Sequence, residues 1–181
     1  MKILLVGFKR YSTHENNPSE LLISKIQRPD VKGLILDINF EKAKELPAII
    51  AEEKPDYIIT MNLSPYRKEP TIEEYAYNEI RSVQPDEAGV THTGEPIIEG
   101  GPRSLNSALD IPSLQNFLAS RGVNCSISVD PGLWIDNEVS YLARYTGVPT
   151  VTIHLPLLTD YPLEDDLELI EGVFEFFDFM N

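Results

Sequence analysis

The sequence is poor in cysteine and in positive charge, and it has no long hydrophobic run. Cys125 is the only cysteine among 181 residues, so an internal disulfide and a cysteine-rich zinc site are excluded, and we expect a cytoplasmic location. Fifteen basic against 29 acidic residues give a net charge of −14, which repels nucleic-acid phosphates and anionic lipid head groups. No stretch approaches the roughly 18 apolar residues of a membrane span. We therefore expect neither a nucleic-acid nor a membrane partner, and no signal segment.

The remaining composition is that of an ordinary globular protein. The hydrophobic fraction of 42% and the charged fraction of 24% are close to the globular average, so the chain can bury a core. A length of 181 residues lies within the usual size of one domain. We expect a single domain over residues 1–181.

Apolar runs alternate with segments of helical periodicity along the chain. Strands are predicted at residues 2–7, 33–38, 56–61, 125–129 and 150–155, the first three as strands buried on both faces. Helices are predicted at residues 18–26, 40–54, 112–121, 133–145 and 164–180. This alternation indicates an α/β fold with a largely parallel sheet.

Two segments do not fit clearly into this alternation of strands and helices. Residues 71–80 carry apolar and aromatic side chains at a spacing that suits either a strand or a helix, so Glu73 is either a solvated acid or part of a site. Residues 82–106 are rich in glycine, proline and polar residues, and predict a long loop or lid. Long loops in compact domains tend to be functional or mobile, and a disordered insertion is the alternative.

Two polar residues stand where ligands of an open α/β sheet bind, outside the carboxyl ends of strands. His154 lies near the end of the strand at 150–155, on the face opposite Val151, Ile153 and Leu155. It either faces a crevice or is a core histidine bonded to a carbonyl. Asp136 lies near the first turn of the preceding helix, where a capping or dipole role is the ordinary explanation of an acid.

Six short motifs follow one another along nearly the whole chain. They are the opening KILLVGF, Asn17-Pro18-Ser19, the block LSPYRKEPTIEEYAYN at residues 63–78, Arg121-Gly122, Gly132-Leu133 and Ile153-His154-Leu155-Pro156. Together they resemble the motifs of the pyrrolidone carboxylate peptidases, also called pyroglutamyl peptidases of the first type. The resemblance implies a three-layer α/β/α sandwich and removal of an N-terminal pyroglutamyl residue by a Cys, His and Glu triad, with no cofactor and no metal.

Carried over residue by residue, the resemblance places the glutamate of the triad on Glu73 and its histidine on His154. The position of the nucleophilic cysteine falls on Asp136, because the family's GLYLCN-type segment reads GLWIDN here. Cys125 lies before the preceding strand, where the family has no catalytic residue. The thiol of the triad is therefore missing.

The resemblance also implies a substrate-binding set, consisting of Phe8, Tyr11, Asn17 and Arg67. Other positions depart from the family pattern, namely Ser12 and Thr13 in place of glycines and Glu74 in place of the arginine of an ER pair. These departures indicate that the substrate pocket has changed as well.

The chemistry of the substitution leads to three hypotheses. An aspartate is a poor nucleophile toward an amide, so we expect no ordinary pyroglutamyl peptidase activity and a pseudoenzyme that binds a small molecule or a peptide N-terminus. The alternative is a hydrolase of changed mechanism, in which Glu73, Asp136 and His154 activate water by general-base catalysis or through a divalent metal. A third possibility is a purely structural or interaction role.

The predicted C-terminal helix suggests self-association. One apolar stripe, formed by Leu167, Ile170, Val173, Phe174 and Phe177, is expected to dock on the sheet. Phe176 and Phe179 fall off this stripe, and exposed apolar surface commonly marks an interface. The family resemblance also favours assembly, so we expect a homo-oligomer, either a dimer or a tetramer. The alternative is that the last turn frays or packs both rings on a neighbouring loop.

Overall fold

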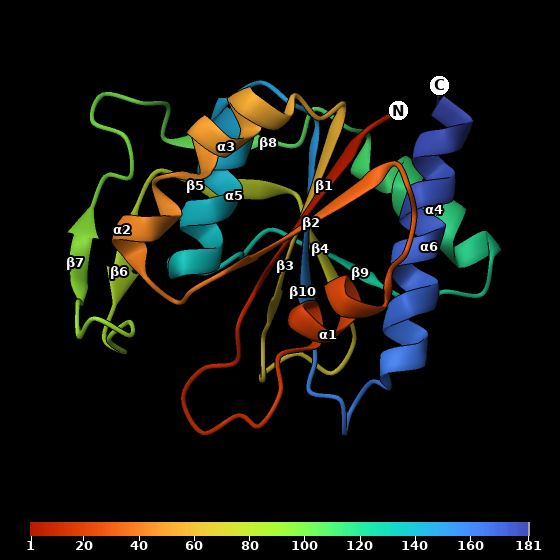
Figure 1. Cartoon of the computed structure of the whole chain (residues 1–181), viewed down its shortest axis with the longest axis horizontal. Coiled ribbons are helices and arrows are strands. Elements are labelled where there is room, and N and C mark those ends of the chain that lie inside the picture. The colour runs from red at the N-terminus through yellow and green to blue at the C-terminus, as the bar shows by residue number, and fades with distance from the viewer. Residues whose placement is uncertain (181) are drawn as a thin grey trace.

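Six strands form a central sheet that is covered by helices on both faces (Figure 1). The computed structural model describes residues 1–180. The elements in chain order are β1 (Ile3–Phe8), α1 (Pro18–Lys25), β2 (Val31–Leu36), α2 (Phe40–Ala43), α3 (Leu46–Glu53), β3 (Tyr57–Leu63), β4 (Thr71–Glu73), β5 (Tyr75–Tyr77), β6 (Ile80–Ser82), β7 (His92–Glu95), β8 (Ser104–Asn106), α4 (Ile111–Ser120), β9 (Ser126–Ser128), α5 (Ile135–Tyr145), β10 (Thr150–Leu155) and α6 (Leu163–Met180).

The sheet is mixed but largely parallel. Its strand order is β2-β1-β3-β10-β4-β9. Strands β2, β1, β3 and β10 pair in parallel, whereas β4 runs antiparallel to β10 and β9 pairs in parallel with β4. The predicted α/β class and the three-layer sandwich implied by the resemblance are therefore confirmed.

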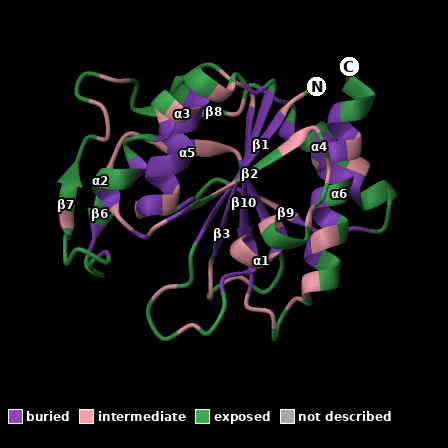
Figure 2. Ribbon diagram, in the orientation of Figure 1, coloured by how far each residue is buried: buried purple, intermediate pink, exposed green. Residues whose placement is uncertain are grey.

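The helices divide into two layers. Helices α2, α3 and α5 cover one face of the sheet, and α1, α4 and α6 cover the other (Figure 1). Each layer encloses its own apolar core, and in Figure 2 the central strands are almost entirely buried. Strand β1 contributes to both cores because successive side chains of a strand point to opposite faces: Ile3 and Leu5 enter the α1/α4/α6 core, and Leu4 and Val6 the other.

The same alternation in β10 positions the polar residues. Val151, Ile153 and Leu155 are fully buried in the α1/α4/α6 core. Thr152 and His154 point to the opposite face, toward α5, where both form hydrogen bonds with its side chains. The predicted strand at 150–155 is confirmed. Because its apolar side chains are buried in the core, the strand is fixed in position, and so are Thr152 and His154 on its other face.

Two predicted elements differ in detail. The strand predicted at 33–38 is β2, Val31–Leu36, and the expectation that it is buried on both faces is wrong, because β2 is an edge strand and Ile35 is 37% exposed. The single helix predicted at 40–54 is two helices, α2 and α3. Proline clashes with the carbonyl four residues earlier, and Pro47 therefore ends α2 at Ala43 and begins α3.

The two segments left open by the sequence form short strands. Residues 71–80 contain β4, β5 and β6 rather than a helix. The prediction of a long loop at 82–106 is wrong in part, because this segment includes β7, which pairs antiparallel with β6, and β8, which pairs antiparallel with β5. Asn78 holds the segment between β7 and β8 in place. Its side chain accepts a hydrogen bond from the Ile98 amide and donates to the carbonyls of Ile98 and Gly101.

Helix α6 docks through more of its surface than the sequence predicted. Phe176 is only 6% exposed because its ring packs edge-on against Phe117 of α4, so the expectation that it lies on a free face is wrong. Phe179 remains 81% exposed. Neither α6 nor any other helix within residues 1–180 is both long and apolar enough to cross a bilayer.

Candidate active site

Glu73, Asp136 and His154 meet at the carboxyl end of β10. The Nδ1 atom of His154 lies 2.8 Å from Oε1 of Glu73, and its Nε2 atom lies 2.5 Å from Oδ2 of Asp136. Both carboxylates therefore lie within hydrogen-bonding distance of the imidazole. The ring is held between two acids, one at each nitrogen.

The three side chains come from three elements. Glu73 ends β4, the strand paired antiparallel with β10 next to His154. Asp136 is the second residue of α5, whose N-terminal dipole favours a negative charge. Side-chain exposures of 0% for Glu73, 3% for His154 and 14% for Asp136 show that only the aspartate faces solvent appreciably.

The two carboxylates keep the imidazole charged. Burial alone lowers the pKa of His154, but the charges and hydrogen bonds of Asp136 and Glu73 outweigh it and raise that pKa from 6.5 to about 9. Burial raises the pKa of the Glu73 carboxyl, but the hydrogen bond and charge of His154 together with hydrogen bonds from Ser128 and Thr71 outweigh burial, and the net pKa lies below the ordinary 4.5. At neutral pH the site is therefore a carboxylate–imidazolium–carboxylate array.

Further contacts orient Glu73. Its Oε1 atom accepts a hydrogen bond of 2.9 Å from the Thr71 hydroxyl, and the Arg67 guanidinium lies 3.4 Å away. Arg67 also donates to the Asp130 carbonyl at 2.7 Å and to the Ser128 hydroxyl at 3.3 Å. These contacts hold the buried carboxylate toward the imidazole.

A buried arginine of α5, Arg144, supports the main chain around the site. Arg144, near the end of α5, is 6% exposed and donates to the main-chain carbonyls of Glu73, Glu74 and Leu105 at 2.8, 2.8 and 2.9 Å. It thereby ties β4, the residue between β4 and β5, and β8 to α5. Burial lowers the pKa of this guanidinium only to about 10, so the arginine is charged at neutral pH.

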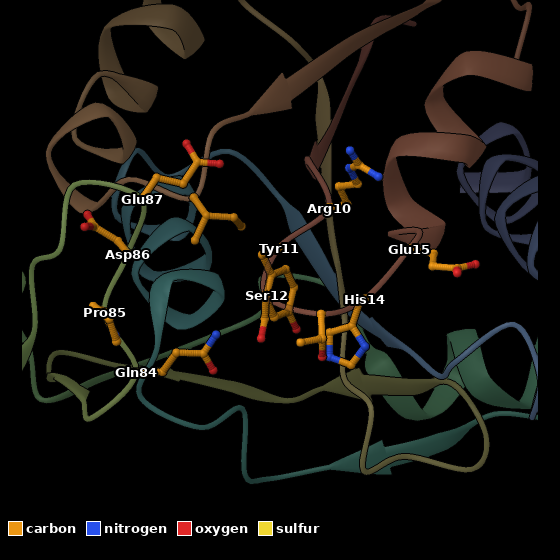
Figure 3. A pocket seen from close by; sticks show the side chains of 11 residues that line it. Arg10, Tyr11, Ser12, His14, Glu15, Gln84, Pro85, Asp86 and Glu87 are labelled. Atoms are coloured by element: carbon orange, nitrogen blue, oxygen red, sulfur yellow. The ribbon is translucent and has the colours of Figure 1, made fainter.

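A cavity of about 700 Å³ opens beside Asp136 and His154. Its walls include the rings of Tyr11 and Trp134, which lie 4.9 Å apart. A second cavity of about 720 Å³ adjoins it and shares part of the 11–14 segment and Gln84 as wall. Figure 3 shows this second cavity, with segments 10–15 and 84–87 on its facing sides. The site therefore has room for a ligand larger than one residue.

The four expected substrate-binding residues fall into two groups. Tyr11 and Arg67 line the cavity beside Asp136. Phe8 and Asn17 do not, and both are 0% exposed. Phe8 belongs to the core beneath α5 because it is the last inward residue of β1, and Asn17 caps α1 by accepting from the Ser19 amide. In this structure neither side chain reaches the cavity, and a substrate contact is not observed for either of them.

The metal version of the alternative hypothesis fits the geometry poorly. Glu73 and Asp136 lie at opposite nitrogens of His154, so no ion can contact the imidazole and both carboxylates together. Residues 1–180 contain no group of three His, Cys, Asp or Glu side chains arranged to hold a metal ion.

Sequence reasoning missed Arg144 and Trp134. A helical signal existed for the arginine, because Asp136, Ser140 and Arg144 recur at intervals of four and so share one face of α5. Ser140 and Thr152 are bonded at 2.6 Å between their hydroxyls, which continues this polar face onto β10. No comparable pattern pointed to Trp134.

Comparison with known proteins identifies related molecules. A family model described as pyroglutamyl peptidase matches residues 1–165. The pyrrolidone-carboxylate peptidase of Pyrococcus furiosus is 34% identical over 172 residues, covering 88% of this chain and 83% of the relative. That of Thermococcus onnurineus is 30% identical over 175 residues, covering 91% and 88%.

Solved structures agree in fold. A crystal structure of the pyrrolidone carboxyl peptidase from Pyrococcus furiosus superposes with a TM-score of 0.87 at 29% identity, covering 97% of both chains. The enzyme from Thermococcus litoralis superposes with a TM-score of 0.87 at 22% identity, covering 96% of this chain and 91% of its own. At that lower identity the second match shows the fold alone.

Proposed function

The chain belongs to the pyroglutamyl peptidase family, and from this premise we propose that it binds a pyroglutamyl-type ligand, free or at a peptide N-terminus, without cleaving its amide. One observation carries the proposal. Asp136, at the position that the resemblance gives to the nucleophilic cysteine, lies 2.5 Å from Nε2 of His154 in a partly buried ion pair.

The chemistry of a carboxylate argues against amide cleavage. Attack of Asp136 on an amide carbonyl would form a mixed anhydride, which lies uphill of the amide, whereas a thiolate forms a thioester and is intrinsically far more nucleophilic. Loss of a covalent nucleophile leaves only about 10³ to 10⁴ of rate enhancement from binding and oxyanion stabilisation. Ordinary peptidase turnover is therefore not expected.

The same substitution preserves the charges of the site. A cysteine peptidase with a Cys–His pair holds a thiolate beside an imidazolium, and Asp136 presents one negative charge to Nε2 of His154. The field that a ligand meets in the cavity is thus similar to that of the peptidase. This supports retained recognition with lost chemistry.

Two assays test the proposal. Trp134 is the only tryptophan of the chain and lines the cavity, so its fluorescence is expected to change when pyroglutamate is titrated. The unmodified protein is expected not to hydrolyse a chromogenic pyroglutamyl amide. Detectable cleavage that is lost on Asp136→Asn would contradict the proposal.

A gain-of-function variant sharpens the test. Asp136→Cys restores a thiol beside His154, and we expect measurable cleavage of the chromogenic amide. Asp160→Cys is the matched control, because Asp160 lies in an exposed segment and pairs only with Lys68. Cys125 is buried and free, so alkylation before assay reports mainly on the introduced thiol.

Water activation is the second candidate function. It is favoured by Glu73, which orients His154 through Nδ1 and leaves Nε2 toward the cavity side. His154 can act as a general base only after it loses its proton, and the carboxylates raise its pKa to about 9. Hydrolysis of this kind is expected to rise as the pH passes 9, which a pH profile between 6 and 10.5 measures.

Self-association remains a proposal as well. Phe179 and Met180 are 81% and 48% exposed at the end of α6, and they form the surface through which we propose a dimer or tetramer. Light scattering at micromolar concentration is expected to give a multiple of the 20.4 kDa chain mass, and Phe179→Ser is expected to reduce it. A cytoplasmic location stays a prediction from the sequence.

A further inference from the structure

Two apolar side chains stand at the mouth of the cavity beside Asp136. Val83 is 98% exposed and Tyr66 is 93% exposed, the two highest values among the large apolar side chains of residues 1–180. Single exposed apolar residues are common on protein surfaces and need no explanation. These two, however, come from separate segments, the loop between β3 and β4 and the residue after β6, and both line the same cavity.

The surroundings of this rim, defined as Tyr66 and Val83, do not oppose an apolar ligand. The nearby guanidinium groups are occupied, since Arg67 pairs with Glu73 at 3.4 Å and Arg81 with Glu79 at 2.9 Å.

The rim is continuous with the cavity that the proposed function fills. Tyr66 and Val83 line the same cavity as Asp136 and Trp134 but are exposed, so the residues that follow a first residue bound beside Asp136 are able to reach them. Free pyroglutamate has no atoms to place there. Apolar side chains on a following residue would cover both exposed groups and remove them from water.

We propose that the ligand is the N-terminal segment of a peptide or protein with an apolar residue at its second or third position, which the rim of Tyr66 and Val83 recognises. This inference rests on the proposed function and names its ligand class. A hydrophobic contact of one side chain discriminates by about 10-fold or more when fully enclosed. An open rim is expected to give about 5-fold to 10-fold.

The experiment measures three ligands by fluorescence of Trp134 and by calorimetry. They are pyroglutamate, pyroglutamyl-leucine amide and pyroglutamyl-serine amide. The leucine peptide is expected to bind about 5 to 10 times more tightly than the serine peptide. In the double variant Tyr66→Ser with Val83→Ser this ratio is expected to fall to nearly 1, while the affinity for pyroglutamate stays unchanged.

A matched double variant controls for loss of surface apolar groups in general. Tyr145→Ser with Val90→Ser removes one tyrosine and one valine that are 51% and 36% exposed and do not line the cavity, and it is expected to keep the ratio. Equal binding of the two peptides by the unmodified protein overturns the role of the rim and leaves the proposed function standing. Absence of binding for all three ligands overturns both.

Discussion

Replacing Asp136 by asparagine isolates the contribution of the ion pair to the site. The variant keeps the shape of the side chain but removes the charge that lies 2.5 Å from His154. Glu73 still holds the other ring nitrogen at 2.8 Å. We therefore expect the pKa of His154 to fall from about 9 partway toward its ordinary value, and the array to lose part of its stability.

The magnitude follows from the two pKa values. A rise from 6.5 to about 9 corresponds to a coupling of about 3 kcal/mol in favour of the folded state. Because the folded pKa is raised, this stability is fully present below pH 6.5 and is lost as the pH rises through 9. Glu73 still contributes its part of this coupling in the Asp136→Asn variant. The free energy of unfolding of the variant is therefore expected to be about 1 to 2 kcal/mol lower at pH 6.

Nuclear magnetic resonance of the imidazole nitrogens measures the titration of His154 directly, and urea unfolding between pH 6 and 10 measures the stability. The control is Asp160→Asn, which removes a carboxylate paired with Lys68 on the surface and is expected to change neither quantity appreciably. If His154 of the unmodified protein titrates at or below 6.5, the charged array does not exist. The proposed mimicry of a thiolate–imidazolium pair would then be refuted.

Two further substitutions probe buried charges away from the imidazole. Arg144→Met leaves three main-chain carbonyls without their donor and is expected to cost about 3 kcal/mol or more in urea unfolding, with Arg144→Lys recovering part of the loss; an unchanged midpoint would contradict the role of this arginine. Burial raises the pKa of Glu138 to about 8, so the unmodified protein should lose stability as the pH rises from 4.5 to 8. Glu138→Gln is expected to make this fall smaller, leaving the parts that His154 and Asp166 contribute, and to raise the melting temperature at pH 8; equal pH profiles for both proteins would refute the reasoning.

The elements of this protein were largely predictable from the sequence. Residue types alone predict β1 and β10. A strand buried on both faces needs an unbroken apolar run such as KILLVG, and a strand with one polar face needs the alternation of apolar and polar residues seen in β10. Pro47 is also a local signal, because its steric effect on the carbonyl four residues earlier divides residues 40–54 into two helices. Strand β2 could not be identified as an edge strand, because strand order depends on contacts between distant segments.

The site shows the same division. Glu73 and His154 were identified through the resemblance, and their residue types already carried the chemistry of an acid and a base. The sequence could not show that Asp136 and Glu73 occupy opposite nitrogens of one ring. That arrangement depends on the antiparallel pairing of β4 with β10 and on how α5 packs on the sheet, and both are contacts between distant segments. That geometry raises the pKa of His154 and argues against a shared metal.

The composition, the apolar periodicity and the order of six motifs determined the class of fold and the family of this chain, because these properties depend on residues that are neighbours in sequence. The tertiary structure alone decided which polar groups share one buried site, which expected substrate residues belong to the core, and which apolar residues remain in water. Phe8 and Tyr66 illustrate this: one ring is 0% exposed and the other 93% exposed. The difference lies in what packs against each side chain, and long-range packing is not encoded in any local pattern.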